Sequence, residues 1–398
     1  MKRNKVVVFT ITAAILLSLN AAAFAVTGKN SAQNKAANLS WINSNINNNG
    51  NLNGIEKLQE YILGNGVNAD MDKNSTVDVF DLAFLRLKFI TPGNETATTT
   101  AVTAVSVETQ TTTAFPPEKN PTEYMDSVRK SMTNSVPSSV TVTPAVRGEI
   151  KNITYRCDYT GKDKKANVVL PVGYTADKKY PVMYVNHGIM GSENDMINDN
   201  MKVRVLAENL AKSGEAKEMI IVCANMYTSK TSNSPSGMTQ QVMDDYDNFL
   251  YDLTESLMPY IEANFSVATG RENTAITGFS MGGRESVYIG IMRPDLFGYI
   301  GGACPAPGIV PGKDSFLDHR GSMSEADFRF KEGQPLPYVF MITGGTNDTV
   351  VGTFPQSYHN LLIKNGVDHI WQEIQGGGHD ANSVVPHMYN FIKAAFKA

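Results

Sequence analysis

From residue 124 to the C-terminus, short apolar runs alternate with segments of helical periodicity, and this alternation constrains the possible folds more than any other feature. The apolar runs have the length of strands and are Ala166–Leu170, Val182–Asn186, Met219–Ala224, Thr274–Thr277, Tyr299–Ala303, Tyr338–Thr343 and His369–Ile374. The helical segments include Asp247–Asn264, Met281–Met292 and Val384–Phe396. Strands that alternate with helices form a mostly parallel sheet with helices packed on it. Residues 124–398 are therefore predicted to form one α/β domain.

The residues before this domain differ from it in composition. Residues 1–25 begin with basic side chains, continue with an apolar run and end in Ala23-Phe24-Ala25, a pattern typical of a cleaved secretory signal peptide. Residues 26–93 are short, polar and Asn-rich, with two helical patterns. Nine of the eighteen residues in 96–113 are Thr, so residues 94–123 are predicted to be a linker that cannot bury enough apolar surface to fold. We expect a secreted protein that acts outside the cell.

Charge and cysteine content narrow the classes of partner. The formal net charge is −4 and no basic stripe is present, so we expect no nucleic-acid partner. No apolar run after residue 25 is long enough to span a membrane, so we expect no membrane partner. Cys157, Cys223 and Cys304 are the only cysteines. They are too few for a dense disulfide framework, although one bridge with a remaining free thiol stays open.

The stretch Gly278-Phe279-Ser280-Met281-Gly282 carries the first chemical signal. It matches Gly-x-Ser-x-Gly and lies between the predicted strand Thr274–Thr277 and the predicted helix Met281–Met292. In that context the serine occupies a sharp strand-to-helix turn, the glycines permit the strained backbone, and the hydroxyl stands clear of the sheet. The motif predicts Ser280 as a nucleophile and an α/β-hydrolase fold for the domain.

A nucleophilic serine needs a histidine as base and an acid that orients the histidine. In this fold both follow the serine, the acid first. Asp348 comes just after the strand Tyr338–Thr343, at the edge where catalytic groups of such sheets collect. His379 follows a run of three glycines directly after the strand His369–Ile374, from which it can reach the nucleophile. The predicted triad is Ser280, Asp348 and His379.

Other residues compete for these roles. Asp348 has an alternative interpretation as a turn residue or helix cap. Asp295 lies at an apparent helix terminus, and Asp380 is too close to His379 in sequence to brace it easily. His359 and His387 lie in helical patterns and are expected to be surface or packing residues.

Stabilisation of the oxyanion requires two backbone N–H donors. One is expected from Met281, the residue after the nucleophile, and the other from the loop that follows an early strand. His187-Gly188-Ile189-Met190-Gly191 follows the strand Val182–Asn186, which makes Ile189 the predicted second donor. We interpret His187 as a structural residue of this loop.

Four stretches together resemble carbohydrate esterase family one, and in particular the feruloyl esterase modules of clostridial cellulosomal xylanases. They are His187 to Asp195, Gly278 to Gly283, Gly344 to Asp348 and Ile374 to Asp380, and their order spans nearly all of residues 125–398. The resemblance implies the same triad of Ser280, Asp348 and His379. Two positions at the expected pocket depart from the family: Met190 replaces a glycine and Met196 an aromatic residue.

A calcium-loop pattern lies in the segment 26–93. Oxygen-bearing groups occur at loop positions 1, 3, 5, 7, 9 and 12, with a backbone carbonyl at position 7. These predicted ligands are Asp70, Asp72, Asn74, Thr76, Asp78 and Asp81. The alternative is a polar loop that caps a helix. With Asp at the last position the segment resembles a dockerin, which implies Ca²⁺ binding and docking to a cohesin of a scaffoldin. An upstream Asn-rich copy would bind calcium weakly, because its side chains are neutral, and its register is not fixed, so no ligands are assigned to it.

These observations predict a cellulosome-bound serine esterase that acts on a plant cell-wall polysaccharide ester through an acyl-enzyme and needs no metal for catalysis. A feruloyl esterase is the first interpretation and an acetylxylan esterase the second. An inactive scaffolding or binding subunit and an acyltransferase are the remaining alternatives.

Overall fold

Strand β3 (Val182–Asn186), with all five residues buried, lies inside an eight-stranded sheet of the order β1-β2-β4-β3-β5-β6-β9-β10. The structure is a computed structural model that describes residues 120–398. The predicted signal peptide, calcium ligands and dockerin-like segment, and all of the predicted linker before Asn120, lie outside the described residues.

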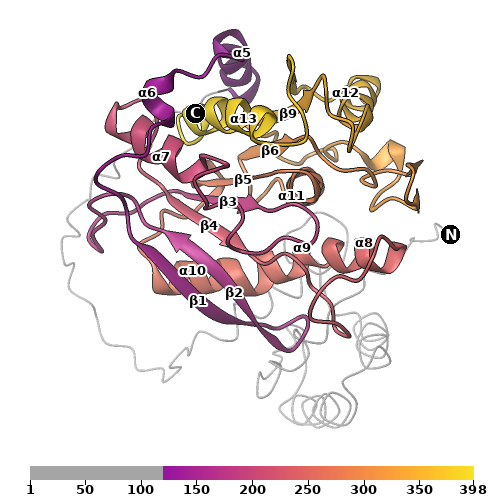
Figure 1. Ribbon diagram of the computed structural model, residues 1–398, viewed down its shortest axis with the longest axis horizontal. Coiled ribbons are helices and arrows are strands. Elements are labelled where there is room, and N and C mark those ends of the chain that lie inside the picture. Colours follow the sequence, from indigo (N-terminus) through magenta and orange to yellow (C-terminus); the bar gives the residue numbers. More distant parts are fainter. Residues whose placement is uncertain (1–119) are drawn as a thin grey trace, which may run out of the picture. The chain divides into compact units, whose positions relative to one another are not determined.

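The central strands pair in parallel, and β2 alone runs opposite to the other seven strands of the sheet, whose arrangement is drawn in Figure 1. The remaining strands are β1 (Ile150–Cys157), β2 (Lys162–Val169), β4 (Ile220–Ala224), β5 (Thr274–Gly278), β6 (Tyr299–Ala303), β9 (Val339–Gly345) and β10 (Ile370–Ile374). The pairs β1–β2 and β2–β4 are antiparallel. A separate two-stranded ribbon joins β7 (Gly312–Lys313) to β8 (Asp318–His319).

Helices cover both faces of the sheet. They are α5 (Pro121–Ser131), α6 (Ser138–Thr141), α7 (Val203–Lys212), α8 (Gln240–Asp247), α9 (Phe249–Asp252), α10 (Met258–Asn264), α11 (Met281–Met292), α12 (Phe354–Lys364) and α13 (Ala381–Ala394). Short turns are the π-helical η1 (Leu253–Leu257) and the 3-10 turns η2 (Arg271–Asn273) and η3 (Glu325–Asp327).

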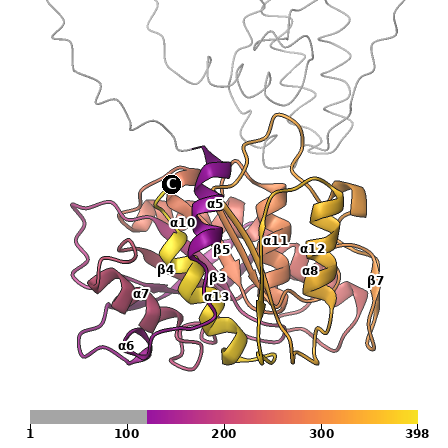
Figure 2. The same cartoon turned by 90° about the horizontal axis from the view of Figure 1, so that it is seen from above.

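Neighbouring residues of β6 show which helix lies on which face. A Cβ on Gly301 would meet Phe391 of α13 at 2.9 Å, whereas a Cβ on Gly302 would meet Val287 of α11 at 2.9 Å. Because successive strand residues point to opposite faces, α11 and α13 lie on opposite sides of the sheet. Figure 2 shows the central strands between them. The predicted α/β-hydrolase fold with a mostly parallel sheet is confirmed.

Some boundaries differ from the sequence prediction. The strand predicted at Ala166–Leu170 begins at Lys162, and β1 was not predicted. Both belong to an edge hairpin that exposes Lys and Asn side chains, so it lacks the apolar run that marks the central strands. The helical region predicted at Asp247–Asn264 starts earlier, because α8 begins at Gln240. Within the predicted range, η1 forms a π-helical turn.

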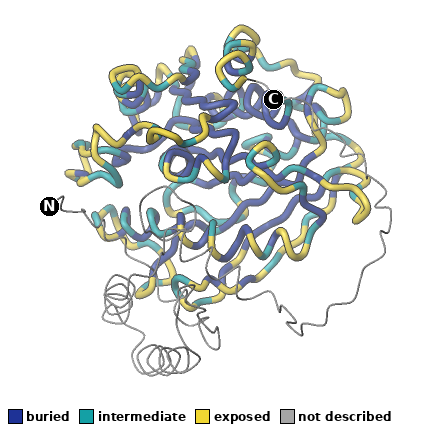
Figure 3. The backbone as a smooth tube through the Cα atoms, turned by 180° about the vertical axis from the view of Figure 1, so that it is seen from behind, coloured by how far each residue is buried: buried dark blue, intermediate teal, exposed yellow. Residues whose placement is uncertain are grey.

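Burial follows this architecture, with the central strands dark blue and the outer loops yellow in Figure 3. Cys157, Cys223 and Cys304 are all buried free thiols, so the bridge left open by the sequence does not form. Among residues 120–398, no helix combines the length and apolar character needed to cross a membrane.

Candidate active site

Ser280 occupies the turn between β5 and α11 with a backbone that side chains rarely adopt. Its φ is 58° and its ψ is −119°. The turn is packed so tightly that a Cβ on Gly282 would lie 2.2 Å from the carbonyl oxygen of Asn186. A Cβ on Gly278 would likewise lie 2.5 Å from the backbone of Gly282. The two glycines are therefore required for the turn that presents the serine.

The three predicted triad residues lie in one chain of hydrogen bonds. Nε2 of His379 is 2.9 Å from Oγ of Ser280, and Nδ1 of His379 is 2.7 Å from Oδ2 of Asp348. A carboxylate only accepts, so Nδ1 carries the proton and Nε2 is left to accept from the serine hydroxyl. This arrangement can draw the proton from Ser280 as its oxygen attacks.

The carboxylate of Asp348 is paired with His379 and is also held in place by backbone N–H groups. Its Oδ1 accepts hydrogen bonds from the backbone N–H groups of Val350 at 2.9 Å and Val351 at 3.1 Å. Burial opposes ionisation of Asp348, but the hydrogen bonds from His379 and from these two N–H groups outweigh it and hold the pKa of Asp348 below its ordinary value. The acid is therefore a carboxylate that can stabilise an imidazolium.

The competing residues lie elsewhere. Asp295 pairs with Arg293, and Asp380 caps α13 by accepting from the N–H of Asn382 at 2.8 Å. His359 stacks on Trp371, and His387 is fully buried between Thr277 and Thr343. None of the four takes part in the hydrogen bonds described for Ser280.

The loop after β10 carries His379 to Ser280, and its backbone lies close against the loop after β9 that carries Asp348. A Cβ on Gly345 would lie 2.3 Å from the carbonyl oxygen of Gly377, so the acid loop and the histidine loop touch. The ring of His379 also packs against Phe279, with ring centroids 4.5 Å apart. These contacts limit how far the base can move from Ser280.

The predicted oxyanion loop lies beside the nucleophile. A Cβ on Gly188 would be 3.7 Å from Cβ of Ser280, and Met190 has a φ of 58°. The N–H of Met190 donates to the hydroxyl of Tyr246 at 2.8 Å. Within residues 120–398, no hydrogen bond uses the N–H of Ile189 or Met281, so both predicted donors remain available.

Comparison with known proteins identifies the family of this chain. A family profile described as a putative esterase matches residues 158–347. The structure is similar to that of a CE1 ferulic acid esterase from Anaeromyces mucronatus in complex with ferulic acid, with 45% sequence identity and a TM-score of 0.64. The match covers 67% of this chain and 97% of the other. This chain belongs to the CE1 esterase family. The predicted assignment as a carboxylic ester hydrolase is confirmed at this level.

Two curated proteins match over shorter stretches. The chain is 33% identical over 159 residues to an endo-1,4-beta-xylanase/feruloyl esterase of Xylanibacter ruminicola, which covers 39% of this chain and 21% of that protein. It is 27% identical over 210 residues to endo-1,4-beta-xylanase Y of Acetivibrio thermocellus, which covers 50% of this chain and 18% of that protein. The matched region thus spans about a fifth of the length of each curated relative.

His187 of this esterase is a structural residue of the oxyanion loop. Its Nε2 accepts from the N–H of Met226 at 3.1 Å, and its Nδ1 lies 2.6 Å from the carbonyl oxygen of Gly188. Burial lowers the pKa of His187, which favours the neutral ring that can both accept and donate. The contacts join the loop after β3 to the loop after β4.

The two methionines at the expected pocket have different environments. Met190 is 55% exposed, whereas Met196 is 1% exposed and belongs to the core. The expectation that both border the pocket is therefore wrong for Met196, because a buried side chain offers no surface to an acyl group. Of the two methionines, Met190 is the one whose side chain lies at the surface.

Sequence reasoning missed Cys304 as a neighbour of the triad. Its Sγ, a carboxylate oxygen of Asp348 and a ring nitrogen of His379 all lie within 4.8 Å of one another. Burial, together with the charge of Asp348, raises the pKa of the Cys304 thiol to about 12. A protonated thiol is a poor metal ligand, so the trio is better described as a triad with a thiol behind its acid.

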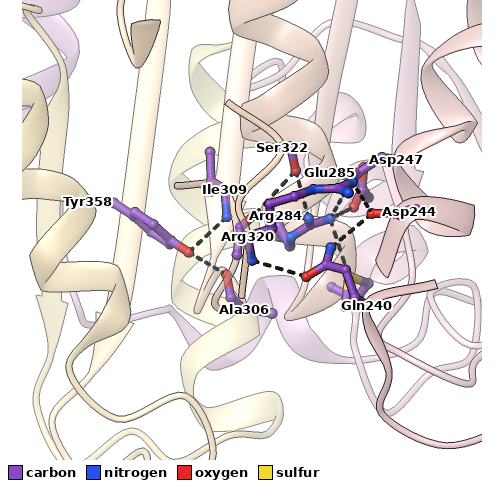
Figure 4. Close-up of polar contacts among 12 residues, drawn as sticks. Gln240, Asp244, Asp247, Arg284, Glu285, Ala306, Ile309, Arg320, Ser322 and Tyr358 are labelled. Carbon is purple, nitrogen blue, oxygen red and sulfur yellow. Dashed lines mark hydrogen bonds and ion pairs between the residues drawn. The ribbon is translucent and has the colours of Figure 1, made fainter. Parts of the chain in front are cut away.

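Behind the nucleophile, Arg284 ties its helix to the segment that follows β6 (Figure 4). The guanidinium is 1% exposed and donates to Asp247 at 2.6 Å, to Glu285, to the carbonyl of Gly308 at 3.0 Å and to Ser322 at 2.7 Å. Burial raises the pKa of Glu285. This cluster fixes the segment Pro305 to Ser322 at the edge of the sheet where Ser280 lies.

Tyr358 of α12 holds the same segment from its other side. Its hydroxyl donates to the carbonyl of Ala306 at 2.8 Å and accepts from the N–H of Ile309 at 3.3 Å. Arg320 reaches α8 through Gln240 and Asp244. One rigid segment therefore joins α8, α11 and α12 beside the candidate site.

Proposed function

We propose that this protein is a secreted serine esterase that removes ester-linked hydroxycinnamates, such as ferulate, from xylan. The observation that carries the proposal is the hydrogen-bonded chain from Asp348 through His379 to Ser280. The identity of the acyl group is supported by the 45% identity to an esterase solved with ferulic acid.

The proposed reaction proceeds in two halves. The hydroxyl of Ser280 loses its proton to Nε2 of His379 while its oxygen bonds to the ester carbonyl carbon. The oxyanion that forms is stabilised by the N–H groups of Ile189 and Met281. His379 returns the proton to the departing sugar oxygen, which leaves an acyl-Ser280. Water, activated by the same histidine, then releases the acid and restores the serine.

The test is the Ser280→Ala variant of the full chain, assayed with methyl ferulate. Removal of a triad nucleophile is expected to lower kcat by at least about 10⁴-fold, because the covalent route is lost. Labelling of the wild-type protein by a fluorophosphonate, and its loss in the variant, would exclude an inactive scaffolding subunit. Full hydrolysis by Ser280→Ala would refute the mechanism.

An acetylxylan esterase with the same triad is the second candidate. The observation that favours it is the large, exposed side chain of Met190, two residues from the Gly188 that faces Ser280. Release of ferulate and of acetate from the same arabinoxylan, measured as kcat/KM, separates the two. A preference for acetate would assign the second function.

For the N-terminal region we propose a signal peptide followed by a dockerin-like module. Its support is the spacing of the oxygen-bearing residues from Asp70 to Asp81. Calcium would serve docking to a cohesin, and catalysis would need no metal. Binding to a cohesin that is lost with a chelator and restored by Ca²⁺ is the expected result, and binding that ignores the chelator would contradict it.

A further inference from the structure

A polar cavity of about 610 Å³ opens beside strand β2, apart from the triad. It is lined among others by Lys165 of β2, by Glu193 of the loop after β3, and by Asn225 and Tyr227 of the loop after β4. We refer to it as the polar cavity. None of its residues takes part in the reaction described above.

The register of the sheet places the polar cavity near the nucleophile. Tyr184 of β3 pairs with Val222 of β4, so Asn186 and Ala224, two residues further on, end their strands level with each other. Asn186 in turn pairs with Gly278 of β5. Two strand spacings, about 10 Å, therefore separate the end of β4 from the strand that presents Ser280.

The wall of the polar cavity is also continuous with the oxyanion loop. The loop after β3 passes Ser280 at Gly188 and reaches the cavity at Glu193. The N–H of Met226, between Asn225 and Tyr227, donates to His187 of the same loop. Tyr227 packs edge-on against Tyr246, with centroids 5.4 Å apart. A ligand in the cavity would thus rest on the elements that form the oxyanion site.

Free donors and acceptors line the polar cavity together. Lys165 is exposed, and its ammonium makes no ion pair within residues 120–398. Oδ1 of Asn225 accepts from the N–H of Tyr227 at 3.1 Å, and its amide NH₂ makes no hydrogen bond within residues 120–398. Glu193 supplies a carboxylate, of which one oxygen accepts from the side chain of Asn194 at 3.4 Å. Hydroxyl groups, each of which both donates and accepts, match such a mixed surface.

The charges of the polar cavity nearly balance, which suits a neutral ligand better than an anion. Its other cations are already paired: Arg156 with Asp163, Lys162 with the carbonyls of Ser229 and Ser232, and Lys164 with Asp252. Lys165 and Glu193 offset each other, and Lys162, whose partners are neutral carbonyls, leaves one net positive charge. A single excess charge, already satisfied by two carbonyl oxygens, offers a phosphate or sulfate little of the charge-assisted bonding that holds such anions.

We propose that the polar cavity binds the neutral glycan chain that carries the ester, an inference that rests on the proposed function. The cavity then acts as a glycan subsite, separate from the acyl group. Its hydrogen bonds hold the polysaccharide while the scissile ester lies at Ser280. Substrates that extend into the cavity should be preferred over small esters of the same acid.

The test compares two esters of ferulate, a feruloylated arabinoxylo-oligosaccharide and methyl ferulate, on the full chain. For Lys165→Ala/Asn225→Ala, the ratio of kcat/KM for the oligosaccharide to that for methyl ferulate is expected to fall about tenfold. Lys151→Ala is the matched control, because this exposed lysine lies on the neighbouring strand β1 outside the cavity. Its ratio should equal that of the wild type.

An unchanged ratio in the double variant would overturn the glycan subsite while leaving the esterase intact. If the wild type hydrolyses neither ester, the proposed function itself has failed. Should the double variant not fold, binding of the unesterified oligosaccharide to the Ser280→Ala protein decides the matter. Calorimetric binding that Glu193→Gln weakens supports the subsite, and absence of binding contradicts it.

Discussion

At the scale of single residues, the site depends on backbone positions that few side chains adopt. Ser280 and Met190 both have a φ of 58°, one in the nucleophile turn and the other in the oxyanion loop. Such conformations cost about 1–3 kcal/mol and persist only where surrounding contacts impose them. For Met190 the contact is the hydroxyl of Tyr246, which is itself fully buried. Tyr246 therefore positions the loop that carries the N–H of Ile189.

This role predicts the effect of Tyr246→Phe. Loss of the hydroxyl frees the N–H of Met190, and the oxyanion donor next to it is held less firmly. We expect kcat for methyl ferulate to fall about tenfold with little change in KM, since the donor acts mainly in the transition state. Steady-state kinetics would measure it.

The control is Tyr389→Phe, which removes another buried tyrosine hydroxyl, one that accepts from Lys393 in α13. Its kcat should match the wild type. Equal kcat for Tyr246→Phe and the wild type would show that the oxyanion loop needs no such support.

At the scale of elements, the edge hairpin β1–β2 is joined to helix α9 by a buried ion pair. Nζ of Lys164 lies 2.6 Å from Oδ2 of Asp252, and their side chains are 8% and 0% exposed. The hydroxyl of Tyr155 donates to the same oxygen at 2.9 Å. Burial lowers the pKa of Lys164 despite the neighbouring carboxylate. The pair therefore ties the hairpin to α9 by a polar contact inside the core.

The hairpin should tolerate loss of the pair better than loss of one partner. Lys164→Met leaves a buried carboxylate without its cation and is expected to lower the free energy of unfolding by about 3–5 kcal/mol. Lys164→Met/Asp252→Leu should lose less than this single variant. Urea unfolding followed by circular dichroism measures both.

Asp295→Asn provides the comparison for an exposed pair, because Arg293 and Asp295 are 37% and 53% exposed. Its cost should stay below about 1 kcal/mol. If Lys164→Met/Asp252→Leu is less stable than Lys164→Met, the ion pair is not the main contact between the β1–β2 hairpin and α9.

At the scale of the whole molecule, stability is linked to pH through a histidine that is not part of the triad. His387 of α13 is fully buried, with Nε2 2.9 Å from Oγ1 of Thr277 in β5 and Nδ1 3.1 Å from Oγ1 of Thr343 in β9. Burial lowers the pKa of His387 to about 3, from 6.5. The folded protein thus keeps this ring neutral where the unfolded chain would protonate it.

Acid should destabilise the fold through this histidine. Between pH 6.5 and about 3 the unfolded chain binds one more proton than the folded chain, so stability rises with pH by up to roughly 1.4 kcal/mol per unit and is lost on acidification. His387→Gln should show a shallower decline in melting temperature over this window. An identical decline in both proteins would assign the acid sensitivity to other groups.

Sequence alone predicted the fold class, the order of the central strands along the chain and the proximity of Ser280, Asp348 and His379. It could do so because buried parallel strands are continuous apolar runs, and the chemistry of a nucleophile turn requires glycines at fixed spacing. The edge hairpin was missed in part because Lys and Asn side chains break its pattern. The fold accommodates Lys151, Asn152 and Lys165 because they face solvent, and Lys164 because it pairs with Asp252.

Only the tertiary structure decided contacts between residues distant in sequence. The thiol of Cys304 behind Asp348, the hydroxyl of Tyr246 on Met190 and the cavity shared by β2 and two loops all join separate segments. It also moved Met196 from the pocket to the core. Local sequence specifies which element forms and which chemistry it carries. Packing of the elements specifies which side chains meet, because that depends on the register and twist of the whole sheet.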